Sequence, residues 1–189
     1  VTGHGAWWLA VGLASGAGLV SKYSALFLGV SILLSVLLLP RLRRWLATPW
    51  PYLGGALAFA MFAPVIAWNL AHGNVSFLKQ FGRARVEGLS LRFIGELVPA
   101  QFGLATPSVF ILGAIGLWAF ARGRAGTRET RVIISAFAWP LLVYFAWHAL
   151  HARVQANWLA PVYPALAIAA AIAARHATWP DRLRRWVTW

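Results

Sequence analysis

The sequence predicts an all-α protein, a polytopic bundle of transmembrane helices with about six spans. Hydrophobic residues make up 60% of the chain and charged residues 11%, whereas a soluble domain is about 25% charged. The charged side chains are clustered, which leaves six runs without Asp, Glu, Lys or Arg: 1–21, 23–40, 45–78, 97–121, 132–152 and 154–174. A membrane span needs about 20 apolar residues, so a bilayer accounts for this pattern.

Each span is bounded by charges, prolines or turn residues. The first is rich in Gly and Ala, which let helices approach closely in a membrane. The second is rich in Leu and Val and ends at Pro40, and Pro64 is expected to kink the third. Arg122 follows the fourth, and arginines flank the last two. The spans are expected at about 6–20, 25–39, 52–68, 105–121, 132–150 and 159–174.

A long polar stretch at 69–104 separates the third span from the fourth. It predicts two short amphipathic helices that lie on the outer membrane surface. Phe77 and Phe81 stand at helical spacing in the first, and Ser90 can cap a second helix that starts near Leu91. The apolar face of the second helix is expected to contain Phe93, Ile94 and Leu97.

The distribution of basic residues predicts the orientation. Alternate connections must face the same side, and they divide the seventeen Lys and Arg into eleven and six. The larger set is Arg41, Arg43, Arg44, Arg122, Arg124, Arg128, Arg131, Arg175, Arg182, Arg184 and Arg185. The smaller set is Lys22, Lys79, Arg83, Arg85, Arg92 and Arg153. The positive-inside rule places the larger set in the cytoplasm. We therefore expect a bacterial inner-membrane bundle at 1–175, a cytoplasmic basic tail at 176–189, and both ends inside.

The six outer cations need an explanation other than orientation. Lys22 lies in a tight turn between two spans, where it can snorkel to the interface or bind a phosphate or carboxylate. Arg83 and Arg85 can contact lipid headgroups or form a cationic cradle for a lipid-linked phosphate, because Arg suits bidentate phosphate contacts. Nucleic acid is not expected as a partner, because the charges lie between apolar runs rather than on one polar face.

The last outer turn combines amides with aromatic rings. Gln155 and Asn157 lie beside Trp158 and Tyr163, a combination that suits sugar hydroxyls and ring faces as well as an interfacial belt. His148 and His151 are three residues apart, but a two-His pair without nearby carboxylates is weak evidence for a metal. We predict no metal and no cofactor. The outer carboxylates, Glu87 and Glu96, stand in no context that marks a general base.

Three segments resemble the bacterial family 39 glycosyltransferases, membrane enzymes of class C related to the dolichyl-phosphate-mannose-protein mannosyltransferases and to the lipid A aminoarabinose transferase. The first runs from Gly12-Leu13 to Ser21-Lys22-Tyr23-Ser24-Ala25. The second is Pro64-Val65-Ile66-Ala67-Trp68-Asn69 with His72-Gly73 and Ser76-Phe77, and the third is Asn157-Trp158-Leu159-Ala160-Pro161-Val162-Tyr163-Pro164. They occur in the family's order and span about 1–175.

The resemblance implies transfer of a sugar from a polyprenyl-phosphate donor to a lipid, glycan or protein acceptor on the periplasmic face. It implies a donor-phosphate site formed by Lys22, Arg83, Arg85 and Arg153. It also implies a sugar or acceptor pocket formed by Tyr23, Trp68, Asn69, His72, Gln80, Gln155, Asn157, Trp158 and Tyr163. The family's catalytic acid lies in the first outer loop, and no matching Asp-Glu pair occurs here. We therefore expect a C-terminal part of a longer enzyme that is inactive alone.

Two other functions compete with this interpretation. A transporter or flippase for lipid-linked anionic substrates predicts ionisable residues in mid-span, and the six charge-free runs argue against it. A non-catalytic membrane scaffold is compatible with the lack of a recognisable catalytic acid. Paired Asp or Glu in an outer loop upstream of this segment would favour the enzyme.

Overall fold

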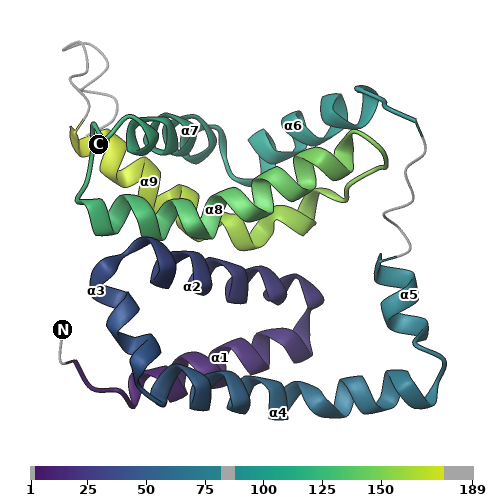
Figure 1. Ribbon diagram of the computed structural model, residues 1–189. Coiled ribbons are helices and arrows are strands. Elements are labelled where there is room, and N and C mark those ends of the chain that lie inside the picture. The colour runs from purple at the N-terminus through teal and green to yellow at the C-terminus, as the bar shows by residue number, and fades with distance from the viewer. Residues whose placement is uncertain (1–2, 82–87, 177–189) are drawn as a thin grey trace, which may run out of the picture. The chain divides into compact units, whose positions relative to one another are not determined.

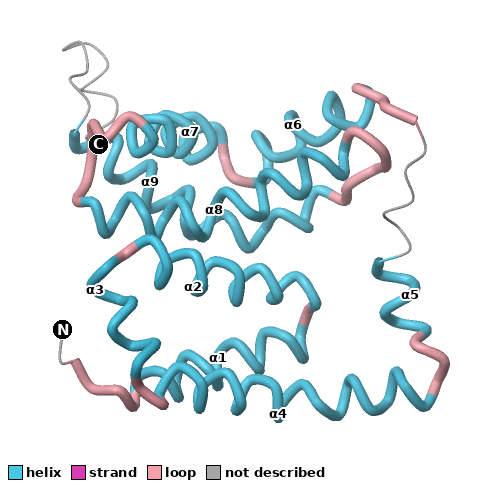
Figure 2. Tube along the Cα trace, viewed as in Figure 1, coloured by secondary structure: helices cyan, strands magenta, loops and turns pink. Residues whose placement is uncertain are grey.

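The computed structural model describes residues 3–81 and 88–176, and within these ranges it consists of helices and short turns without a strand (Figure 1, Figure 2). The chain divides into two compact units, unit 1 at Val1–Arg85 and unit 2 at Val86–Trp189. Because every described element is a helix, the predicted all-α class is confirmed. Of the expected basic tail, only its first residue, His176, falls in the described ranges.

Unit 1 contains all of the first three predicted spans. Its elements are α1 (Trp7–Ser21), the 3-10 helix η1 (Tyr23–Ala25), α2 (Leu26–Leu38), α3 (Pro40–Arg43), the 3-10 helix η2 (Arg44–Ala47), α4 (Trp50–Ala71) and α5 (Val75–Phe81). α4 is longer than the predicted third span at both ends. Pro64 lies inside it, and the helix continues for seven residues to Ala71.

Glycines bring α1 and α4 into close contact. A Cβ added at Gly12 would collide with the carbonyl oxygen of Gly54, and one added at Gly16 would lie 3.1 Å from Cα of Ala58. The contact positions on both helices rise together along the chain, so α1 and α4 run parallel. Their C-terminal ends therefore lie at the same end of unit 1, as the alternation of spans predicts. Small residues permit this approach because they expose the backbone to the neighbouring helix.

Unit 2 contains the other three predicted spans and the second surface helix. Its elements are α6 (Arg92–Leu104), α7 (Pro107–Ala121), α8 (Arg128–Ala149), the 3-10 helix η4 (Ala156–Val162) and α9 (Tyr163–His176). Thr127 caps α8, because its Oγ1 accepts a hydrogen bond from the backbone N–H of Thr130 at 3.2 Å.

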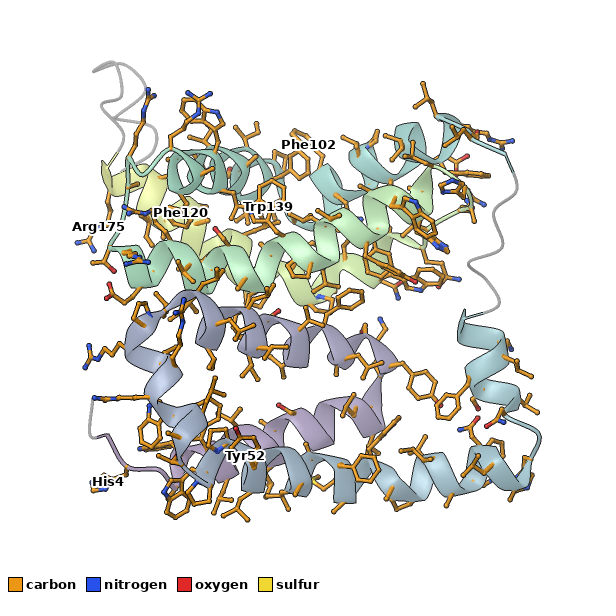
Figure 3. The ribbon with its side chains drawn as sticks, in the orientation of Figure 1. His4, Tyr52, Phe102, Phe120, Trp139 and Arg175 are labelled. Carbon is orange, nitrogen blue, oxygen red and sulfur yellow. The ribbon has the colours of Figure 1, made fainter. Side chains whose placement is uncertain are left out.

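The packing of α7 on α9 follows the same scheme as that of α1 on α4. A Cβ at Gly113 would lie 3.0 Å from the carbonyl oxygen of Leu166, and one at Gly116 would collide with that of Ala169. These contacts make α7 and α9 parallel. Figure 3 agrees, since Phe120 and Arg175, near the C-terminal ends of the two helices, lie toward the same end of unit 2.

The described helices differ in their ability to cross a bilayer. Three are long and apolar enough by themselves: Trp50–Ala71, Arg128–Ala149 and Ala156–Arg175. The described part of the chain offers up to five if each bent pair, α2 with α3–η2 (104°) and α6 with α7 (109°), counts as one span. α1 is apolar but has 15 residues, or about 22 Å of helix against a hydrocarbon core of about 30 Å. The six predicted spans thus correspond to six helices. Three of these are long and apolar enough to cross a membrane alone, two more are so only as part of a bent pair, and α1 is shorter.

The two surface helices predicted in the long polar stretch correspond to α5 and α6. The polar loop before α6 is anchored at Ser90, whose backbone N–H donates to the carbonyl oxygen of Leu150 at 2.8 Å. Its Oγ also accepts from the backbone N–H of Arg92 at 3.3 Å. The helix begins at Arg92, close to the predicted start, but its N-cap residue is Leu91 and no side chain caps it, so the predicted cap by Ser90 is wrong.

Candidate functional site

Lys22 occupies a fixed turn between α1 and α2. Its backbone is extended (φ −159°, ψ 132°), its N–H donates to the carbonyl oxygen of Gly18 at 2.8 Å, and its own carbonyl oxygen accepts from Ala25 N–H at 3.0 Å. The side chain is exposed, and within the described ranges no carboxylate pairs with it. A charged ammonium is thus presented on a backbone that both flanking helices restrain.

Tyr23 fastens this turn to the rest of unit 1. Its ring lies 6.0 Å from that of Phe62 on α4, nearly edge-on at 82°. It also lies 5.7 Å from the ring of Phe77 on α5. Edge-to-face aromatic pairs of this kind stabilise by about 0.5–1.5 kcal/mol beyond the area they bury. The predicted pocket residue Tyr23 therefore joins the Lys22 turn to α4 and α5.

Trp68 and His72 form a flat surface at the C-terminal end of α4. Their rings are stacked, with centroids 4.3 Å apart and planes at 13°. Nδ1 of His72 lies 2.8 Å from the carbonyl oxygen of Trp68, which fixes the imidazole over the indole. The indole remains half exposed. Both residues were predicted to line a sugar or acceptor pocket, and the exposed ring pair offers the flat face that such a role requires.

Asn69 lies between these two residues in sequence, yet its side chain points inward and is fully buried. Its Nδ2 donates to the carbonyl oxygen of Val65 at 2.9 Å, and its Oδ1 accepts from the backbone N–H of Ser76 at 3.1 Å. Its own carbonyl oxygen accepts from Asn74, which has a left-handed backbone (φ 57°) that Asn tolerates well. Asn69 therefore holds the turn that carries His72 and starts α5.

The remaining unit 1 candidates lie at the end of α5 and beyond. Gln80 belongs to α5. Arg83 and Arg85, predicted as phosphate ligands, lie outside the described residues. Their assignment stays a prediction.

In unit 2, one carboxylate holds two of the outer cations. Nε of Arg153 lies 2.8 Å from Oε2 of Glu96, and Nε of Arg92 lies 3.2 Å from Oε1. Oε2 is buried and makes no hydrogen bond within residues 3–81 and 88–176, so its contact with Arg153 is an ion pair. Both arginine side chains are about three-quarters exposed (77% and 75%), whereas that of Glu96 is one-third exposed. Arg153, predicted to bind phosphate, thus already has an anionic partner.

The amide and aromatic residues of the last outer turn form a second group. Nε1 of Trp158 donates to Oε1 of Gln155 at 3.1 Å, and Trp158 packs 6.0 Å from the rings of Phe145 and His148. The side chains of Gln155 and Asn157 are exposed. The turn therefore presents two amides beside a half-buried indole, which is the arrangement predicted for sugar hydroxyls.

Histidines of this region do not gather with other ligands. His151 uses Nδ1 toward the carbonyl oxygen of Trp147 at 2.9 Å. His148 is buried, and its Nδ1 has no hydrogen-bond partner among the described residues. Across residues 3–81 and 88–176, no three His, Cys, Asp or Glu side chains lie together as metal ligands would.

The similarity to known proteins points to the same class of enzyme. Residues 2–68 match the family model for dolichyl-phosphate-mannose-protein mannosyltransferase. The chain is also 29% identical, over 178 residues, to the lipid A galacturonosyltransferase RgtD of Rhizobium johnstonii (strain DSM 114642 / LMG 32736 / 3841). This alignment covers 93% of the chain and 37% of RgtD. The chain is therefore similar to family 39-like membrane glycosyltransferases. The resemblance seen in the sequence is thus confirmed, and no solved structure matches the chain.

The region that matches the family model ends at Trp68. It therefore contains the Lys22 turn, Tyr23 and the glycine contact of α1 with α4, whereas the exposed ring pair begins at its last residue. The groups of unit 2 lie beyond the family model but inside the alignment with RgtD, which covers most of the chain.

An apolar cavity of about 210 Å³ lies between α1, α2 and α4, within the region that matches the family model. Gly29 and Gly55 leave space in its lining, because a Cβ at either would meet no described atom within 4 Å. Leu26 lines the part that is near the Lys22 turn in sequence. The hydroxyl oxygen of Ser15 is buried and has no hydrogen-bond partner in the described part of the chain. A cavity with this lining suits a hydrocarbon chain.

Sequence reasoning missed two residues that organise unit 2. Gln101 is buried and bonds to two distant segments, as described below. Glu96 was noted without a role, and the structure makes it the partner of two arginines. The available signal was chemical: an amide within the charge-free run 97–121, and a carboxylate in a strongly basic chain. Neither signal identifies the partner.

Proposed function

We propose that the full-length protein is a membrane glycosyltransferase that moves a sugar from a polyprenyl-phosphate donor to a lipid, glycan or protein acceptor on the periplasmic face. The observation that carries this proposal is the Lys22 turn. It lies inside the region that matches the family model, its neighbour Tyr23 is held by two aromatic contacts, and its exposed ammonium has no carboxylate partner among the described residues.

The chemistry explains why a cation is needed. During transfer, the bond between the anomeric carbon and the donor phosphate oxygen breaks, and a bond to an acceptor hydroxyl oxygen forms. The phosphate leaves with the electron pair and gains one negative charge, while the acceptor proton passes to a base expected upstream. A fixed cation beside the phosphate stabilises the charge that develops on it. Lys22 is the described residue that best suits this role.

The apolar cavity of unit 1 supports a lipid-linked donor. It is lined by Ala25 and Leu26, which follow the Lys22 turn directly, and it extends along α1 to Trp8. A phosphate held at Lys22 would leave the start of its prenyl chain next to this cavity. Burial of hydrocarbon there would contribute about 0.8 kcal/mol per methylene group.

Within unit 2, the last outer turn offers groups that suit a sugar. Gln155 and Asn157 provide amide donors and acceptors for hydroxyls, and Trp158 provides a ring face. The name of RgtD supplies a specific candidate, a galacturonosyl donor with lipid A as acceptor. A uronic acid carries a carboxylate, which the guanidinium groups of Arg92 and Arg153 would bind in competition with Glu96.

The proposed orientation follows from the basic residues. The eleven-to-six division places the connections with the smaller set, including Lys22 and Arg153, on the periplasmic side of a bacterial inner membrane. The protein would then meet its lipid-linked donor at the outer surface of that membrane. Membrane lipids are its other expected partners.

The decisive experiment compares Lys22→Ala, Lys22→Arg and Lys79→Ala in the full-length protein. The assay follows radiolabelled sugar released from a polyprenyl-phosphate donor in lipid nanodiscs. Loss of a hydrogen bond to a charged group costs about 1.5–3 kcal/mol, so kcat/KM should fall about 10- to 100-fold in Lys22→Ala. Lys22→Arg keeps the charge and should retain part of the activity.

Lys79→Ala is the matched control. Lys79 is also an exposed lysine of unit 1, in the last turn of α5, and it lies outside the matched region. It should leave kcat/KM unchanged. Equal activity of Lys22→Ala and the unsubstituted protein would remove Lys22 from the donor site, and absence of sugar release from every donor tested would refute the proposed function.

A further inference from the structure

Gln101 differs from the other buried polar side chains of the described ranges in the reach of its hydrogen bonds. Ser31 and Ser35 donate to carbonyl oxygens four residues back in α2, and Asn69 bonds within seven residues. Gln101, which is 5% exposed, bonds to residues 55 and 62 positions away. Its amide therefore shapes the tertiary structure of unit 2 rather than its own helix.

These two bonds hold both ends of η4. Nε2 of Gln101 donates to the carbonyl oxygen of Ala156, the first residue of η4, at 2.8 Å. Oε1 accepts from the hydroxyl of Tyr163, the residue directly after η4, at 2.8 Å. The carbonyl of Ala156 accepts only, which requires the amide nitrogen on that side and the amide oxygen toward the tyrosine hydroxyl. One amide thus satisfies two groups at opposite ends of the same segment.

The segment between these ends needs such support. η4 is a 3-10 helix of seven residues that contains Pro161. Runs of 3-10 helix longer than about three or four residues are uncommon, because their hydrogen-bond geometry is poorer than that of an α-helix. Pro161 also lacks an N–H to donate. Tethers at both ends compensate for these weak internal bonds.

We propose that Gln101 is a positioning residue for the donor sugar. It acts through Ala156 and Tyr163 to fix the backbone between them, which carries Asn157 and Trp158. The inference rests on the proposed function, since these two residues are its candidate sugar ligands. It also changes the role of Tyr163, whose hydroxyl donates to Gln101 and orients η4 rather than reaching for a hydroxyl of the sugar.

The test uses Gln101→Leu, Gln101→Glu, Tyr163→Phe and the double variant in the full-length protein. Each net hydrogen bond contributes about 1 kcal/mol, so the loss of two in Gln101→Leu should raise the donor KM about 10- to 30-fold with a smaller change in kcat. Tyr163→Phe should show a smaller rise in KM. The double variant should be less than additive, because both single changes remove the same bond.

Gln101→Glu provides a rescue that depends on pH. A neutral carboxylic acid can donate to Ala156 and accept from Tyr163, so it keeps both bonds. An ionised carboxylate cannot donate, and the donor KM should rise as pH increases through the pKa of the introduced acid. Ser35→Ala, which removes a buried hydrogen bond in unit 1, is the control and should leave the donor KM unchanged.

Hydrogen exchange separates this inference from the proposed function. Faster exchange of amides 156–163 in Gln101→Leu, together with a raised donor KM, is the expected result. Unchanged exchange, or faster exchange with an unchanged donor KM, would overturn the positioning role. If the unsubstituted protein transfers no sugar, the proposed function fails and the sugar role of Gln101 fails with it, while exchange still measures whether the amide holds η4.

Discussion

Three glycines of unit 2 offer a graded test of the helix packing. Gly103 on α6 has open space where a Cβ would lie, since no atom of the described residues comes within 4 Å. A Cβ at Gly113 on α7 would lie 3.0 Å from the carbonyl oxygen of Leu166, and one at Gly116 would collide with that of Ala169. Replacement of each by Ala adds the same methyl group to three different environments.

The expected stabilities follow from two opposing terms. Gly→Ala in a helix gains about 1 kcal/mol of helix propensity, and Gly103→Ala should keep this gain. At Gly113 the facing backbone must move by a few tenths of an ångström, which should offset most of the gain. At Gly116 the helices must separate, because a backbone carbonyl cannot rotate away as a side chain can. Overpacking costs about 1–3 kcal/mol, so Gly116→Ala should lose up to about 2 kcal/mol overall.

Thermal unfolding of the full-length protein in nanodiscs, followed by tryptophan fluorescence, measures this order. For 150–250 residues, 1 kcal/mol corresponds to a shift of about 2–4 °C in Tm, and the shift is smaller for a longer protein. Tm should be highest for Gly103→Ala, intermediate for Gly113→Ala and lowest for Gly116→Ala. If Gly116→Ala unfolded at the same temperature as Gly103→Ala, the parallel contact of α7 with α9 would be refuted.

Three further predictions concern the turns and ion pairs. Thr127→Ala removes the cap of α8 and should lower stability by about 1 kcal/mol, measured by chemical unfolding. Asn74→Gly should be tolerated at its left-handed backbone, whereas Asn74→Val should cost about 1–2 kcal/mol and increase proteolysis near α5. Glu96→Gln should change stability by less than about 1 kcal/mol, because the pairs are largely exposed. In the transfer assay, Glu96→Gln should lower the donor KM if Arg153 binds the donor, because the competing carboxylate is gone. It should raise the donor KM if Arg153 only connects the last outer turn to α6, because that connection is lost.

The helices could be predicted because membrane burial excludes charge. Each predicted span falls on an observed helix, and the turn at Lys22 appears where the sequence placed it. The limits of α4 were less accurate. α4 begins two residues before and ends three residues after the predicted span 52–68, which already included Pro64. Local pattern therefore locates the helices better than it locates their ends.

The candidate site was less predictable, because residue type does not reveal direction. Asn69 and Asn157 are both amides next to tryptophan in sequence, and the sequence assigned both to one pocket. Asn69 is fully buried with its amide bonded inside unit 1, whereas Asn157 is exposed. The partners of Gln101 lie 55 and 62 residues away, and no local pattern encodes such pairings.

The ion pairs of Glu96 change the relative merit of the outer cations as phosphate ligands. Arg92 and Arg153 share one carboxylate, so a phosphate at either guanidinium must compete with a charge already in place. Lys22 has no such competitor among the described residues, and its backbone is held by α1, η1 and the aromatic contacts of Tyr23. A ligand that is already positioned loses less conformational entropy on binding. Both arguments, charge and preorganisation, favour Lys22 for the donor phosphate. Arg153 instead connects the last outer turn to α6 through its ion pair with Glu96.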